Sequence, residues 1–258
     1  MTSPDRRFAI ARRALGTLIV KEASVWGRGH AVWSQPAIFL ALTAGGLTLP
    51  LSLLRDVLAA EPGGVLGGAA SVLSGLLATA PAIAAVLWFQ NALIGERQSG
   101  TAAWVLSKPV PRWTMPASKL IVHGGGTLLA GVVLPGALAW GVLATALPSA
   151  PPLGAFAAAL AVLALHATFY AALALALGAS FDARGVVVAV PLVLLLGGDL
   201  ALSALPAAAR ATPWLLGRGA GAMMQGAAFP LPEAIAATAT WTVALLALAF
   251  VRFGRRDL

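Results

Sequence analysis

The chain has 258 residues, of which 59% are hydrophobic and only 10% are charged, whereas an ordinary soluble domain carries about 25% charged residues. This composition argues against a soluble globular fold and predicts an all-α integral membrane protein. The formal net charge is +8 and cysteine is absent, so disulfides, thiolate catalysis and cysteine-ligated metal centres are excluded.

The first 35 residues predict a helix that lies in the cytoplasmic membrane interface. On a helical wheel, one face is apolar and the opposite face is basic, which is typical of interfacial helices. The apolar face carries Phe8, Ala11, Leu15, Leu18, Ile19 and Trp26, and the basic face carries Arg6, Arg13 and Lys21. Glu22 falls on the apolar side and interrupts the pattern. A solvated basic tail is the alternative.

Six membrane spans are predicted from uncharged runs, because a spanning helix needs about 20 mostly apolar residues. The run from Leu120 to Phe181 is too long for one helix, and Pro148, Pro151 and Pro152 divide it. The fifth span is interrupted by an acid, Asp199. The whole chain, 1–258, is interpreted as a single transmembrane domain with spans at about 36–54, 63–95, 120–147, 153–180, 185–205 and 234–251.

The basic residues are distributed unevenly among the predicted loops. Fourteen lie on one side of the membrane and three on the other. The side with more Lys and Arg is normally cytoplasmic, so we expect a multi-pass protein of the cell membrane with both termini in the cytoplasm. The larger set is Arg6, Arg7, Arg12, Arg13, Lys21, Arg28, Arg97, Lys108, Arg112, Lys119, Arg184, Arg252, Arg255 and Arg256; the smaller is Arg55, Arg210 and Arg218. Topology thus accounts for the charge, and no nucleic-acid partner is expected.

No catalytic, metal or nucleotide-binding pattern is present in the sequence. His30, His123 and His166 are dispersed, without the spacing of a zinc site. His166 is interpreted as a hydrogen-bonded residue between helices. None of the three lysines lies in a phosphate-binding loop of the GxxxxGK type. We therefore expect no enzyme activity and no cofactor in this chain, and any ATP-driven work must come from another chain.

The loop after the second span is the most informative polar segment. It places Glu96 and Arg97 at the end of the span, and Gly100 and Thr101 offer a helix break and an N-cap for a short helix over 102–106. Pro109 and Pro111 force an extended stretch afterwards. The segment predicts a short, rigid surface element at the cytoplasmic face.

This loop resembles that of the type-2 permeases of ATP-binding-cassette (ABC) exporters. The matching positions are Ile94, Glu96, Arg97, Gly100, Thr101, Leu106, Ser107, Pro109, Val110, Arg112 and Lys119. Lys21 and Glu22, followed by Arg28, and the ending from Phe253 to Leu258 are also similar to that family, whereas Trp104 and Pro116 depart from it.

The resemblance implies a permease subunit that moves its substrate by alternating access, usually outward. It also implies two copies of an ABC ATPase that bind ATP and Mg²⁺, and a homodimer or pseudo-dimer of permeases in membrane lipid. The loop would then be a coupling helix that contacts the ATPase, with Glu96, Arg97, Gly100, Thr101, Leu106, Pro109 and Arg112 as the contact residues.

An ion-coupled secondary transporter is the main alternative, with Asp199 as its proton or cation site, because an acid inside a span usually marks a pathway. Gly197 and Gly198 could instead loosen the helix and let Asp199 reach the extracellular boundary, where Arg210 could pair with it. An integral-membrane enzyme or an assembly factor is a third reading.

Overall fold

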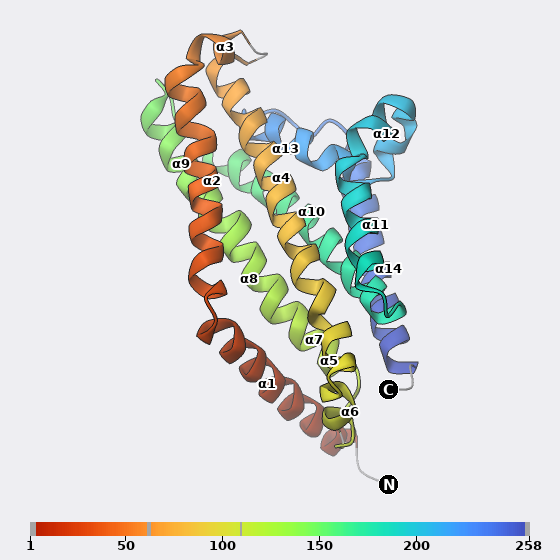
Figure 1. Ribbon diagram of the computed structural model, residues 1–258. Helices are drawn as coiled ribbons and strands as arrows, with labels where there is room; N and C mark the ends of the chain where they lie inside the picture. The colour runs from red at the N-terminus through yellow and green to blue at the C-terminus, as the bar shows by residue number, and fades with distance from the viewer. Residues whose placement is uncertain (1–3, 61–62, 109, 256–258) are drawn as a thin grey trace.

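The structure, a computed structural model, describes residues 4–60, 63–108 and 110–255. All regular elements in these residues are helices (Figure 1). Five helices are long and apolar enough to cross a membrane, as the composition predicts for an all-α membrane protein. They are α2 (Ala31–Leu53), α4 with α5 (Gly64–Ala92 and Ile94–Gln98), the segment Thr114–Ala146, α10 (Leu153–Ser180) and α14 (Pro232–Arg255).

The third of these helices begins earlier than the sequence predicts. It includes α7 (Thr114–Lys119), a π-helical turn η1 (Leu120–Gly124), α8 (Gly125–Leu128), a second π-helical turn η2 (Leu129–Val133) and α9 (Leu134–Ala146). The predicted start at residue 120 rested on the charge of Lys119. This residue is buried inside the helix, because carboxylates from other helices neutralise it.

The predicted fifth span is a bent pair of helices. Helix α11 (Arg184–Leu196) and helix α12 (Gly198–Ala204) meet at an angle of 51°. Gly198 lies so close to the Trp214 ring that a Cβ would approach Cδ1 to 2.5 Å. With 13 residues, α11 alone extends roughly 20 Å, less than the hydrocarbon core of about 30 Å. Only both segments together reach the length of a span.

Helix α10 occupies the centre of the bundle. It is rich in alanine, and most residues of its C-terminal half are buried. The helix packs mainly against α4 and α14. Helices α11 and α13 (Leu216–Met224) pack on it as well. Small side chains allow helix backbones to approach closely, which matters where lipid provides no hydrophobic drive between helices.

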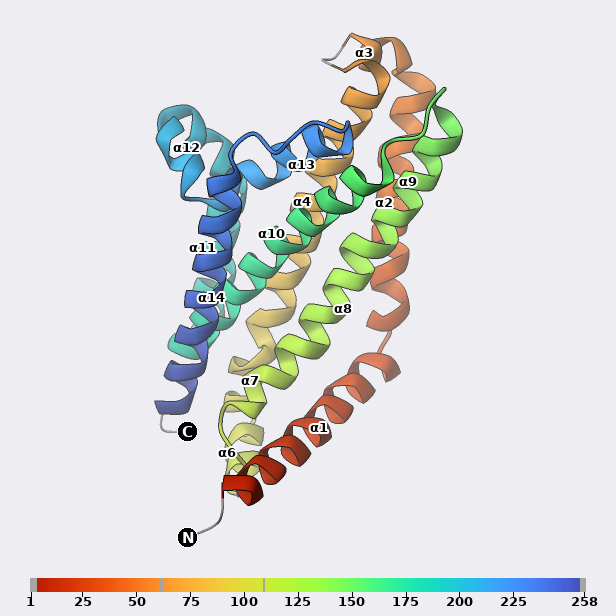
Figure 2. The ribbon, with the colours of Figure 1, turned by 180° about the vertical axis from the view of Figure 1, so that it is seen from behind.

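The two ends of the bundle are built differently (Figures 1 and 2). At one end, α1 (Pro4–Arg28) lies obliquely below the bundle, beside α5 and α6 (Thr101–Leu106), and the last turn of α14 points the same way. We call this the α1 end. The opposite end carries α3 (Arg55–Ala59), α12 and α13. Two short 3₁₀ turns, η3 (Pro206–Arg210) and η4 (Pro213–Leu215), connect α12 to α13. We call it the α12 end.

Candidate functional site

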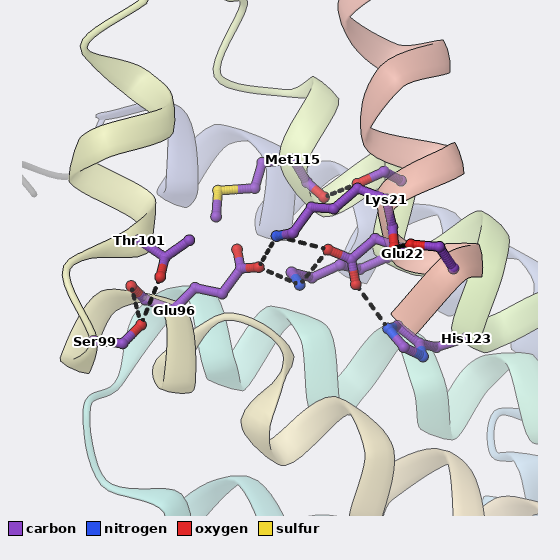
Figure 3. Close-up of polar contacts among 10 residues, drawn as sticks. Lys21, Glu22, Glu96, Ser99, Thr101, Met115 and His123 are labelled. Atoms are coloured by element: carbon purple, nitrogen blue, oxygen red, sulfur yellow. Dashed lines mark hydrogen bonds and ion pairs between the residues drawn. The ribbon is translucent and has the colours of Figure 1, made fainter. Parts of the chain in front are cut away.

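A cluster of charged side chains joins four elements at the α1 end (Figure 3). It consists of Lys21 and Glu22 of α1, Glu96 of α5, Lys119 of α7 and His123 of η1, and we call it the charge cluster. The Glu96 carboxylate lies 2.8 Å from Lys21 Nζ and 3.0 Å from Lys119 Nζ. The Glu22 carboxylate lies 3.2 Å from Lys119 Nζ and 3.1 Å from His123 Nε2.

The position of Glu22 on the apolar face of α1 follows from this cluster. Helix α1 packs with that face against α7, so a carboxylate there is withdrawn from water. Lys119 and His123 are four residues apart, and this spacing places both side chains on the same side of the helix. The irregularity in the amphipathic pattern of α1 is therefore the point at which the helix is fastened to the bundle.

Burial and ion pairing shift the pKa values of Lys21 and Glu22 in opposite directions. Burial alone would raise the pKa of the Glu22 carboxyl, but the hydrogen bond from His123 and the charges of Lys119 and Lys21 lower it to about 2. Burial alone would lower the pKa of Lys21, but Glu96 and Glu22 outweigh it and raise the value. Both groups are thus charged at neutral pH. The two lysines match the two glutamates of the cluster in formal charge.

Arg97 fastens α5 to a different part of the bundle. Its guanidinium donates to the carbonyl oxygens of Gly178 and Phe181, each at 2.8 Å, and pairs with Asp182 at 3.2 Å. The first two acceptors belong to the C-terminal end of α10, where carbonyl groups lack helical partners. Neighbouring Gln98 accepts a hydrogen bond from Arg184 at 2.7 Å. Helix α5 is thereby tied to α1, α7, α10 and α11.

Helix α6 stands next to this fixed point. Gly100 has a φ of +73° and is the N-cap residue, so the expected N-cap at Thr101 is wrong. Thr101 is the first helical residue, and its hydroxyl lies 2.9 Å from the Ser99 hydroxyl. The left-handed backbone of Gly100, which favours glycine, turns the chain sharply between α5 and α6.

The two faces of α6 differ in what they contact. Ala102 and Val105 are buried, so this face rests on the bundle. Trp104 is 65% exposed, and Lys108 Nζ lies 3.9 Å from the centre of its ring. Tryptophan is enriched in protein interfaces, and the cation–π contact holds this ring beside Lys108 at the surface.

The remaining predicted contact residues lie around α6. Leu106 is its last residue, and Arg112 reaches the Gly254 carbonyl in the last turn of α14 at 3.4 Å. Pro109 lies outside the described residues. Of the predicted set, Glu96 and Arg97 point into the bundle, whereas Thr101 belongs to the surface element.

Asp199 lies at the α12 end, far from this site. It lies in the first turn of α12 and pairs with Arg218 at 2.8 Å, and the Asp199 and Arg218 side chains are 72% and 63% exposed. The expected pairing of Asp199 with Arg210 is therefore wrong. The expected loosening of the helix at Gly197 and Gly198 coincides with the bend between α11 and α12.

Sequence reasoning on chemistry missed Lys119 and His123 as members of a cluster. The available signals were their spacing and the acid on the apolar face of α1. The interpretation of His166 as a hydrogen-bonded residue between helices is confirmed, because its Nδ1 lies 3.2 Å from the Pro213 carbonyl oxygen.

Comparisons with known proteins add no family to this picture. A scan against protein-family models and a search of curated proteins both found no match for the chain. Within the described residues, no three histidine, aspartate or glutamate side chains are grouped as metal ligands.

Proposed function

We propose that the chain is the transmembrane permease subunit of an ABC transporter of the exporting type that its loop resembles. The observation that carries the proposal is the construction of α5 and α6. An exposed surface helix is joined by one glycine turn to a short helix that is tied by charged side chains to four elements of the bundle.

This construction suits the transmission of a movement. A partner that moves α6 would move α5 with it, because only Ser99 and Gly100 separate the two helices. Through Glu96 the movement would reach α1 and α7, and through Arg97 it would reach the end of α10. We assign Trp104, Thr101 and Lys108 to the contact with the ATPase, whereas Glu96 and Arg97 transmit the motion inside the chain.

The proposed complex contains two copies of an ATPase subunit and a dimer of permeases. ATP and Mg²⁺ bind to the ATPase, and hydrolysis of ATP there would drive alternating access in the permease. Glu96, Arg97, Gly100, Thr101, Leu106, Pro109 and Arg112 remain the proposed coupling segment. The exposed ion pair of Asp199 gives the ion-coupled alternative no specific support, because an exposed, paired acid is not a desolvated pathway site.

The same proposal places the α1 end in the cytoplasm. The first turn of α1 and the last turn of α14 lie at one end of the bundle (Figure 1). This arrangement needs an even number of crossings, so the bent pair of α11 and α12 would serve as the sixth. An alkaline-phosphatase fusion after Leu258 should be inactive, and an active fusion would contradict this topology.

Co-purification tests the proposed contact. The ATPase subunit of the proposed complex should co-purify with the wild-type chain and be lost or strongly reduced with Trp104→Ala. Trp33→Ala is the matched control, since Trp33 is also a highly exposed tryptophan but lies on α2. Equal recovery of the ATPase with both variants would reject α6 as the contact.

A further inference from the structure

A cavity of about 520 Å³ opens at the α12 end, away from the charge cluster. It lies between α4, α10, the bent pair and α13, with Ser74, His166, Tyr170, Trp214, Asp199 and Arg218 among its lining residues. Asp199 and Arg218 are exposed, whereas His166 and Tyr170 are buried. The cavity therefore leads from an exposed rim to buried polar side chains, and its volume is in the usual range for small-molecule sites, about 300–1,000 Å³.

Two of these buried side chains have polar atoms without a partner. His166 Nε2 and the Tyr170 hydroxyl are both buried and make no hydrogen bond within the described part of the chain. The two residues are one helical turn apart on α10, and their rings meet edge to face with centroids 5.0 Å apart. A buried polar atom without a partner is costly. These two atoms therefore favour a ligand that enters the cavity and forms hydrogen bonds with them.

The chemistry of the free atoms can be read from their neighbours. His166 Nδ1 faces the Pro213 carbonyl oxygen, which can only accept, so Nδ1 carries the proton and Nε2 is left as an acceptor. Ser74 donates its hydroxyl hydrogen to the Ser71 carbonyl, so its oxygen also remains an acceptor. Tyr170 can donate or accept. The buried wall thus offers acceptors together with one hydroxyl.

We propose that this cavity binds a small neutral molecule with several hydroxyl groups, a polyol. One ligand hydroxyl can donate to His166 Nε2 while it accepts from the Tyr170 hydroxyl, so both orphaned atoms are satisfied without burying a charge. A carboxylate would be disfavoured, because its oxygens would face the lone pairs of His166 Nε2 and the Ser74 hydroxyl oxygen. An ammonium group would lose its hydration with no carboxylate at the buried end.

Two other features of the cavity fit this ligand. The Trp214 indole is held in place by a hydrogen bond from Nε1 to the Leu194 carbonyl at 2.7 Å, and it offers an aromatic surface to the carbon skeleton of a polyol. At the rim, Asp199 and Arg218 neutralise each other, so the entrance has no net attraction for either charge. The inference goes beyond the proposed coupling and does not depend on an ATPase partner.

The test is a binding measurement on the purified full chain in nanodiscs, without ATP or ATPase. The probes are glycerol, myo-inositol, glucose and trehalose, with cationic glucosamine and anionic gluconate as charged counterparts of glucose. We expect at least one neutral polyol to bind and raise Tm, and both charged sugars to bind more weakly than glucose. If no neutral polyol binds, or if the charged sugars bind as tightly as the best neutral probe, the proposal is overturned.

Variants locate the binding. Tyr170→Phe removes only the hydroxyl and should weaken Kd about threefold to tenfold, the usual effect of one hydrogen bond. His166→Phe should weaken it to a similar extent. Thr168→Val is the matched control, because Thr168 lies between them on α10 and bonds to its own helix at Ala164; it should leave Kd unchanged.

The ligand-free protein separates a binding role from a structural one. Tyr170→Phe should leave its Tm unchanged or raise it, since a buried hydroxyl without a partner is removed. A clear fall in Tm without ligand, or an unchanged Kd for Tyr170→Phe, would contradict the assignment of this hydroxyl to the ligand.

Discussion

The two ends of the bundle each contain an ion pair of ordinary length, but the pairs differ in burial. Lys119 and Glu22 lie 3.2 Å apart with side chains 5% and 6% exposed, whereas Asp199 and Arg218 lie 2.8 Å apart and are mostly exposed. Water screens the second pair, while the first belongs to a network in which every member needs its partners. Burial, more than distance, therefore distinguishes the two pairs: the buried pair holds α1 on the bundle at the α1 end, whereas the exposed pair leaves the cavity at the α12 end open to a ligand.

The largest effect is expected when the charge cluster loses one member. Glu22 and Glu96 share two cations, the half-exposed Lys21 and the buried Lys119. Lys119→Met removes the buried one, which leaves one more negative than positive charge in the cluster, and should cost about 3–5 kcal/mol of stability. Thermal unfolding in detergent checks this. Adding Glu22→Gln should restore part of the loss, because the uncompensated charge is removed. A Lys119→Met variant as stable as wild type would show that the network is dispensable.

The next effect concerns acid pH and the docking of α1. The pKa of Glu22 is lowered to about 2 from 4.5, so its contribution is complete above pH 4.5 and is lost as the pH falls toward 2. The loss should be on the order of 3 kcal/mol. Hydrogen exchange of α1 amides should accelerate over this range. Glu22→Gln should remove this pH dependence, and an unchanged profile in that variant would contradict the assignment.

A smaller effect is expected at the link between α5 and α10. Arg97→Met removes the donors to the Gly178 and Phe181 carbonyls and should lower stability by about 2 kcal/mol, since hydrogen bonds to charged groups are worth about 1.5–3 kcal/mol each and water can replace part of them. Arg184→Met is the control, because its bond to Gln98 is exposed. Equal losses in the two variants would show that burial of Arg97 adds nothing.

The smallest effect is expected at the rim of the cavity. Asp199→Asn breaks the exposed pair with Arg218 and should change stability by less than about 1 kcal/mol. In transport assays on the proposed complex, this variant should retain its activity. A loss of transport that follows the ion gradient would instead favour the secondary-transporter alternative.

The elements that the sequence predicts well are those set by local composition. The uncharged runs mark α2, α4, α10 and α14, and the prolines after residue 147 separate α9 from α10 as expected. The two glycines at 197 and 198 indicate where the helix after α11 is weak, but the close packing of Trp214 on Gly198 comes from a distant part of the chain and has no local signal.

The candidate site was only partly predictable for the same reason. The loop pattern identifies Glu96 and Arg97 but not the direction of their side chains, since their partners Lys21 and Gly178 come from helices far away in the sequence. A lysine such as Lys119 looks like a span boundary in the sequence. Only the fold brings carboxylates close enough to make it part of a helix interior.

Site-specific cross-linking tests the proposed coupling most directly. The chain has no cysteine, so Ala103→Cys introduces a unique thiol on α6 for a maleimide photocross-linker and leaves Trp104 in place, and Leu205→Cys introduces one at the α12 end. Both positions are exposed. In membranes that contain the proposed ATPase subunit, we predict that the ATPase is captured from position 103, in a yield that changes with nucleotide, and not from position 205. Capture from position 205, or no capture from position 103 beside an intact complex, would contradict the account.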